Sequence, residues 1–229
     1  NTGAIDLNAK ILTLDYNGGN ILVNNTNRTI TSSVVGGILA IKGFKTVTNS
    51  GSGTLLLDTN VTTQLTAGID FGGTLTYING ILEINAGGSV SGNAPVYNAG
   101  STLIYNTGND FARSLEWIHN GVGTIGSPIS PGYPNNVIVT GTSNLNYIGG
   151  TGTANNKAIE GNLTIDASSG LYMDFGGAAS SGGSLTVKGN VVNNGGFSLG
   201  NGIGNDLYIA GNWTNTGTFI PKTRAVFFN

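Results

Sequence analysis

The C-terminal third of the chain repeats itself with a period of 22, and this spacing constrains the fold more than any other feature. Apolar triplets that begin with leucine recur at the spacing, and so do single phenylalanines. A unit of this size cannot bury its own apolar face, whereas units stacked on one another can. The repeat therefore predicts a solenoid whose interior columns contain six residues: Leu163, Leu185, Leu207, Phe175, Phe197 and Phe219.

The rest of the chain has the pattern of short strands separated by tight corners. Apolar and polar residues alternate in runs of three to five, which is the pattern of half-buried strands. Glycine and asparagine clusters flank most runs, and these residues supply the positive φ angles that tight corners require. The runs upstream of the clear repeat are residues 21–23, 38–41, 55–57, 75–78, 81–84, 103–105 and 137–139.

These patterns predict an all-β chain that forms one right-handed parallel β-helix over residues 1–229. A spacing of 22 divides the chain into roughly ten coils, and the ~4.8 Å strand spacing gives a rod of about 50 Å. A β-sandwich also has many short strands and turn signals. A sandwich, however, does not require phenylalanine to recur in register at a fixed spacing, so the solenoid is the preferred fold.

Composition excludes several classes of protein. Charged residues make up only 9% of the chain and the net charge is −2, while 38% of the residues are hydrophobic. That combination does not fit a disordered chain, and it leaves no cationic stripe for nucleic acid. No apolar run approaches the ~20 residues that span a bilayer. The chain has no cysteine, which removes disulfides and thiol nucleophiles.

One segment, residues 106–136, interrupts the strand pattern and is predicted to be an inserted loop region. It contains the single histidine and three of the five prolines. Insertions in solenoids project from one face, which is often the binding face. The candidate ligand-binding residues are therefore Arg113, Trp117, His119 and Tyr133. The alternative interpretation is that the aromatic residues only cover the end of a coil.

The C-terminal half resembles a known group of repetitive proteins. Residues 211–219 read Gly-Asn-Trp-Thr-Asn-Thr-Gly-Thr-Phe, and residues 224–229 read Arg-Ala-Val-Phe-Phe-Asn. This is similar to a repeat in very long surface proteins of Bacteroidota that the type IX system secretes, and the resemblance covers about residues 100–229. It implies an extracellular or cell-surface location and an adhesive role, gliding-motility adhesins included. It also implies that this chain is a segment of a longer polypeptide.

The sequence offers little support for catalysis. Parallel β-helices often carry polysaccharide lyases and hydrolases, whose sites need clustered carboxylates. The eleven acidic residues are dispersed, and the spacings of Asp166, Asp174 and Asp206 do not fit one column, so turn hydrogen bonding is their expected role. We therefore expect no enzyme activity, no catalytic residue, no metal ligand and no cofactor. Loop carbonyls and asparagine side chains leave bound calcium open.

Three functional hypotheses follow. The first is a non-catalytic structural or adhesive segment of a large secreted bacterial surface protein, with neighbouring domains of the same chain or a second copy as partners. The second is a β-helix that binds or cleaves glycans, centred on residues 110–134, with surface polysaccharide as its partner. The third is an extracellular matrix protein that polymerises with itself. None of the three involves nucleic acid or membrane insertion.

Overall fold

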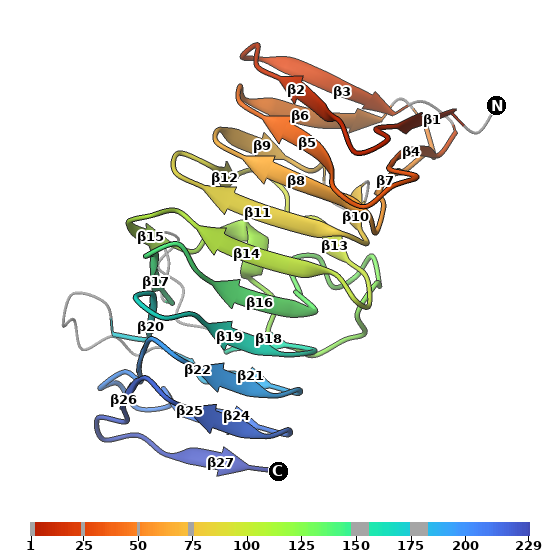
Figure 1. Ribbon diagram of the computed structural model, residues 1–229. Helices are drawn as coiled ribbons and strands as arrows, with labels where there is room; N and C mark the ends of the chain where they lie inside the picture. The colour runs from red at the N-terminus through yellow and green to blue at the C-terminus, as the bar shows by residue number, and fades with distance from the viewer. Residues whose placement is uncertain (1–2, 24–25, 50, 73–75, 148–155, 175–182) are drawn as a thin grey trace.

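The chain winds into a stack of coils in which strands from successive coils lie side by side (Figure 1). The structure is a computed structural model that describes residues 3–23, 26–49, 51–72, 76–147, 156–174 and 183–229. Every pairing between the described strands is parallel. The predicted parallel β-solenoid is therefore confirmed.

One sheet, here called the long sheet, runs through the whole stack and has nine strands. Its strands are β2 (Ile11–Leu14), β5 (Gly37–Ile41), β8 (Val61–Leu65), β11 (Ile81–Asn85), β14 (Thr102–Asn106), β16 (Asn136–Val139), β19 (Leu163–Ile165), β22 (Val191–Asn193) and β25 (Trp213–Asn215).

Two shorter sheets complete the coils of the N-terminal half. Sheet A contains β1 (Gly3–Asp6), β4 (Arg28–Thr31), β7 (Leu55–Leu57), β10 (Thr76–Ile78) and β13 (Val96–Tyr97). Sheet C contains β3 (Gly19–Val23), β6 (Lys45–Asn49), β9 (Gly68–Asp70) and β12 (Ser89–Val90).

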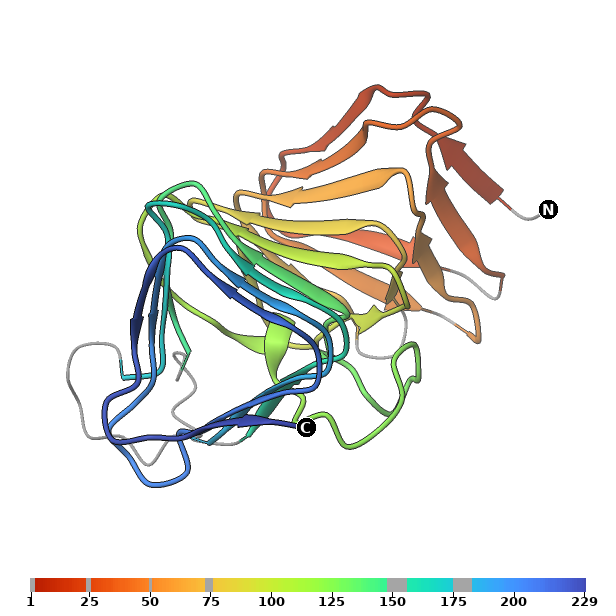
Figure 2. The same ribbon diagram turned by 60° about the horizontal axis from the view of Figure 1, so that its bottom comes forward.

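Two further sheets complete the coils of the C-terminal half. Sheet D contains β15 (Asp110–Ala112), β17 (Asn144–Asn146), β20 (Gly170–Tyr172), β23 (Gly196–Ser198) and β26 (Thr218–Ile220). Sheet E contains β18 (Lys157–Ile159), β21 (Leu185–Val187), β24 (Leu207–Ile209) and β27 (Val226–Phe228). Viewed from the C-terminal end, the blue coils run counter-clockwise as they approach the viewer, which makes the helix right-handed (Figure 2).

The stack has fewer and more variable coils than the sequence predicts. The nine strands of the long sheet correspond to about eight turns, or about 40 Å at the usual strand spacing. The shortest coil leads from Thr62 to Ile81, and the longest leads from Thr102 to Asn136. The prediction of roughly ten coils was too high because most coils are longer than the repeat of the C-terminal third.

The predicted columns are correct for the last coils only. Leu185 pairs with Leu207 in sheet E, and Phe197 pairs with Phe219 in sheet D. Leu163 was wrongly assigned, because it lies in the long sheet and pairs with Val191. The position before Phe197 in its column belongs to Leu171, whereas Phe175 lies outside the described residues.

Inward-facing side chains from all sides of the coils fill the interior. In the long sheet, one inward column includes five residues that are almost completely buried, namely Leu82, Leu103, Val137, Leu163 and Val191. Their outward neighbours are partly exposed, so the alternation of the sequence corresponds to the two faces of the sheet. Burial of a branched apolar side chain is worth about 1.5–3 kcal/mol, and this column repeats that gain in five successive coils.

A ladder of Gly-Asn pairs forms the corner before the long sheet in the C-terminal half. The backbone N–H of Asn190 donates to Asn162 Oδ1 (2.8 Å), and the backbone N–H of Asn212 donates to Asn190 Oδ1 (2.8 Å). Each preceding glycine lies against the coil below it, since a Cβ on Gly189 or Gly211 would lie 2.5 Å from a backbone carbonyl oxygen. The repeated Gly-Asn pair is therefore a requirement of stacking.

At the insertion, sheets A and C of the N-terminal half end and sheets D and E of the C-terminal half begin. Strand β15 pairs with β17 and so belongs to sheet D, which narrows the insertion to residues 113–135. The insertion begins with a single 3₁₀ turn, η2 (Leu115–Trp117), in which Glu116 and Trp117 are buried. Figure 2 shows this turn within the outline of the coils.

Candidate functional site

The insertion separates the four predicted ligand-binding residues into two groups. Trp117 and Arg113 are almost completely buried in the interior. His119 is partly exposed, and Tyr133, although buried, reaches residues of the surface with its hydroxyl. The structure therefore brings only His119 and Tyr133 together at the surface.

Trp117 and Arg113 attach the insertion to the coils that follow it. The indole Nε1–H of Trp117 donates to the carbonyl oxygen of Ala158 in β18 (2.9 Å), and its ring meets Tyr147 edge to face with centroids 6.0 Å apart. The Nη1 of Arg113 donates to the carbonyl oxygen of Trp117 (2.8 Å), and the Cζ of Arg113 lies 5.5 Å from the centre of the Tyr147 ring. These contacts give both side chains a structural role in which neither ring nor guanidinium faces solvent.

The carboxyl group of Glu116, which is not among the predicted site residues, is buried beside them. Glu116 Oε1 accepts hydrogen bonds from the backbone N–H of Ser114 (2.7 Å) and from the hydroxyl of Tyr105 (3.0 Å). Burial raises the pKa of Glu116, and burial and the Glu116 charge raise the pKa of Tyr105. A raised carboxyl pKa is frequent at catalytic sites. Here the carboxyl group is completely buried, and its hydrogen bonds connect η2 to Ser114 and to Tyr105 of β14.

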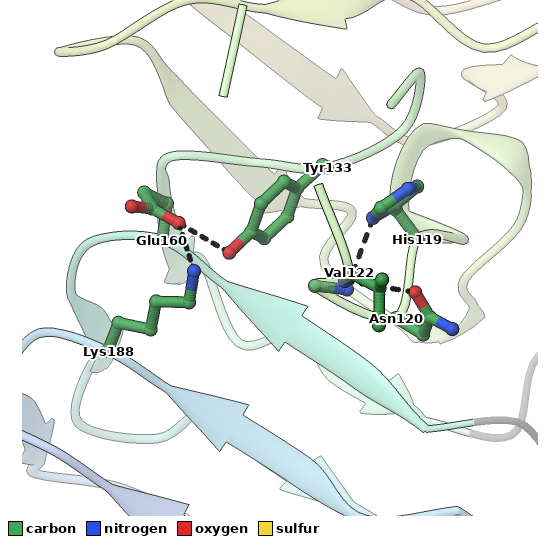
Figure 3. A network of polar contacts seen from close by, with 7 residues as sticks. His119, Asn120, Val122, Tyr133, Glu160 and Lys188 are labelled. Carbon is green, nitrogen blue, oxygen red and sulfur yellow. Dashed lines mark hydrogen bonds and ion pairs between the residues drawn. The ribbon is translucent and has the colours of Figure 1, made fainter. Parts of the chain in front are cut away.

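The surface part of the insertion forms a polar network with two coils of sheet E. We call His119, Tyr133, Glu160 and Lys188 the surface cluster (Figure 3). The hydroxyl of Tyr133 donates to Glu160 Oε2 (2.5 Å), and Lys188 Nζ donates to the same oxygen (2.8 Å). The His119 ring stacks on the Tyr133 ring with centroids 5.2 Å apart and an interplanar angle of 26°.

The charges of the surface cluster are mutually satisfied. Burial opposes ionisation of Glu160, but the hydrogen bonds from Lys188 and Tyr133 outweigh it and lower the pKa of Glu160. The hydrogen bond to Glu160 raises the pKa of Lys188. Burial, together with the hydrogen bond to Glu160, raises the pKa of Tyr133 to about 12. At neutral pH the cluster therefore contains a carboxylate, an ammonium group and a neutral phenol.

The hydrogen bond that His119 accepts does not suit a general base that activates a serine. Its Nδ1 accepts a hydrogen bond from the backbone N–H of Gly121 (3.1 Å), which assigns the proton of the neutral ring to Nε2. A histidine that activates a serine needs the opposite tautomer, with Nε2 as the acceptor. Burial and the nearby charge of Lys157 lower the pKa of His119, so the ring is neutral at pH 7. Ser130 is close, since a Cβ on Gly123 would lie 2.2 Å from Ser130 Oγ and 3.4 Å from His119 Cε1.

The acidic residues near the repeats bind backbone and neighbouring side chains. Asp206 Oδ1 accepts a hydrogen bond from the backbone N–H of Ala225 (2.9 Å), and Asp174 forms an ion pair with Lys222 (3.2 Å). Among the residues that the structure describes, no three histidine or acidic side chains come together as a metal-binding group.

Glu160 and Lys188 are the members of the surface cluster that the sequence did not reveal. Glu160 directly follows β18, and Lys188 directly follows β21. These two strands pair in parallel with Lys157 opposite Leu185. Their proximity becomes visible only when that register is known, because the clear repeat in the sequence has a shorter spacing of 22.

Searches against family models, curated proteins and solved structures found no match to this chain. Within the described ranges, no helix has the length and apolar character needed to cross a membrane.

Proposed function

We propose that the chain is a non-catalytic structural and adhesive segment of a large secreted bacterial cell-surface protein. The observation that carries the proposal is the long sheet, which continues through nine strands from β2 to β25. Each coil is joined to the next by parallel hydrogen bonds and by the shared apolar interior. Stability in such an array adds coil by coil through nearest-neighbour contacts, so its length can grow without a larger core.

Exposed apolar side chains at the two ends of the stack support the proposal that the coils belong to a longer assembly. The last coil surrounds an apolar cavity of about 250 Å³ lined by Trp213, Phe219 and Phe228 among others, and Phe228 is 64% exposed. At the other end Ile11 is 63% exposed. Open strand edges and exposed apolar side chains favour pairing with further strands. The proposal is that further coils, or a second copy of the chain, cover these ends.

The chemistry of the insertion supports the non-catalytic part of the proposal. Glu160 is engaged by Lys188 and Tyr133, and the Nδ1 of His119 accepts a backbone hydrogen bond. The resemblance of residues 100–229 to secreted surface repeats supports the cellular location and the adhesive role. Together these features favour a rod that holds adhesive parts away from the cell.

Single-molecule force spectroscopy on the whole chain, attached through its two ends, tests the load-bearing role. A rod of stacked coils should lose one coil at a time, and a coil of 22 residues releases about 75 Å of extended chain. The expected trace is a series of steps of about this length, or longer for longer coils. A globular single-domain protein pulled in the same attachment serves as the force reference. Unfolding of the whole chain in one step, at a force below that of the reference, would contradict the proposal.

A further inference from the structure

The outer face of sheet D contains a groove of about 330 Å³ that lies apart from the surface cluster. Two columns of outward-facing residues form it. One column contains Asn144, Gly170, Gly196 and Thr218 in register, and the neighbouring column contains Tyr172. The two adjacent glycines place no side chain between Asn144 and Thr218 in this column, and Gly196 lines the groove together with Gly195.

The glycines of this column are required for space. A Cβ on Gly170 would lie 2.4 Å from Cε2 of Tyr172, and a Cβ on Gly196 would lie 2.9 Å from the Tyr172 hydroxyl oxygen. Neither glycine has the positive φ that would make glycine necessary for the backbone. The Tyr172 ring therefore lies back across the two glycines, where any larger residue would displace it.

The lining combines an aromatic ring with uncharged polar groups. None of the described residues that line the groove is charged; they include the amide of Asn144, the hydroxyls of Ser169 and Thr218, and the apolar side chain of Ile220. Ser169 is only 3% exposed, and its Oγ has no hydrogen-bond partner among the described residues. Because the Ser169 Oγ is closed to solvent, the polar groups open to a ligand include the amide of Asn144 and the hydroxyl of Thr218.

This chemistry suits a sugar better than a peptide or an anion. Sugar rings have apolar faces that pack on aromatic rings and hydroxyl edges that bond to amides and hydroxyls. An extended peptide that adds to a sheet needs a free strand edge, but β20 and β23 are paired on both sides. An anion would need a positive group, which the lining lacks. The volume is at the lower end of the range for small-ligand sites.

We propose that the groove beside Gly196 binds a neutral polysaccharide, with Tyr172 as the stacking platform. This inference rests on the proposed adhesive role and gives it a ligand class. It also moves the expected glycan contact from the insertion, where Trp117 is buried, to the outer face of sheet D.

The test measures binding of the whole chain to three neutral oligosaccharides, cellohexaose, laminarihexaose and mannohexaose, and to one charged one, hexagalacturonate. Saturation-transfer NMR detects weak binding, and calorimetric titration measures the affinity. We expect at least one neutral hexasaccharide to bind and Tyr172→Ala to weaken it about tenfold. Tyr16→Ala is the matched control, because Tyr16 is 80% exposed in the first coils and lies outside the groove, so its affinity should be unchanged.

Gly196→Ala is a second variant, which keeps the test decisive if Tyr172→Ala fails to fold. The added Cβ meets only the far end of the Tyr172 side chain at close range, so the variant should fold, narrow the groove and weaken binding. No binding of any neutral hexasaccharide would overturn the inference, as would equal affinities of the wild type, Tyr172→Ala and Gly196→Ala. Preference for hexagalacturonate would also overturn it. The pulling experiment uses no sugar, so failure of the groove is distinguishable from failure of the load-bearing role.

Discussion

Substitution of Gly189 by alanine tests how closely the coils are stacked. An ideal Cβ on Gly189 would lie 2.5 Å from the carbonyl oxygen of Gly161 and 2.6 Å from Asn162 Oδ1. Ordinary contacts of a Cβ begin near 3.4 Å, so the two coils have to separate at this corner. Separation weakens the hydrogen bonds that Gly161 O accepts from the Gly189 N–H (2.9 Å) and that Asn162 Oδ1 accepts from the Asn190 N–H (2.8 Å).

The expected cost follows from these contacts. Overpacking costs about 1–3 kcal/mol, and each weakened hydrogen bond adds about 0.5–1.5 kcal/mol. Alanine restricts the unfolded chain and returns about 0.4–1 kcal/mol. Gly189→Ala should therefore lower the free energy of unfolding by about 1–5 kcal/mol.

Urea unfolding followed by tryptophan fluorescence measures the change, and hydrogen exchange at the Gly189 and Asn190 amides locates it. Gly19→Ala is the matched control. Gly19 has no positive φ, and its Cβ would come no closer than 3.5 Å to another side chain. The control should remain within about 1 kcal/mol of the wild type. Equal midpoints for the two variants would refute the close stacking of these corners.

Three further outcomes follow from the insertion and from strand β18, which it contacts. Trp117→Ala should lower the free energy of unfolding by about 3–5 kcal/mol in the same urea assay, because it leaves a cavity and an unpaired carbonyl at Ala158. His119 is the only histidine, and its pKa is lowered by burial and by Lys157. On acidification through pH 6.5 the unfolded chain takes up this proton first, so stability should fall in the wild type and stay flatter in His119→Gln. Burial and the Arg113 charge lower the pKa of Lys157 from 10.5 to about 8; urea titrations should show stability rising between these pH values, and the rise should disappear in Lys157→Met.

The fold was predictable from the sequence because stacked coils need similar residues at equivalent positions. Inward leucines and Gly-Asn corners recur wherever a coil has the same length as the one below it, as between Leu185 and Leu207. Leu163 was misplaced because a leucine-threonine-isoleucine triplet fits the inward-outward-inward pattern on any side of the coil. Only the pairing of Leu163 with Val191 shows which side it occupies.

The candidate site was less predictable because its contacts span coils of unequal length. The composition of the insertion cannot distinguish an aromatic platform from a buried anchor, and the partner of the Trp117 indole lies 41 residues further along the chain. The groove on sheet D depends on Tyr172 lying over Gly170 and Gly196. The sequence contains both glycines, but their neighbourhood follows from the register between β20 and β23, which the repeat spacing does not reveal.

The most direct test of in-register stacking is the distance between nitroxide spin labels at Ile104 and Thr214, measured by double electron–electron resonance. Both residues face outward on the long sheet, in a column that continues through Ile138, Thr164 and Val192. Four steps of the strand spacing predict a narrow distribution centred at about 20 Å. A broad distribution, or a centre beyond about twice that distance, would contradict the stacked coils on which the proposed rod and groove depend.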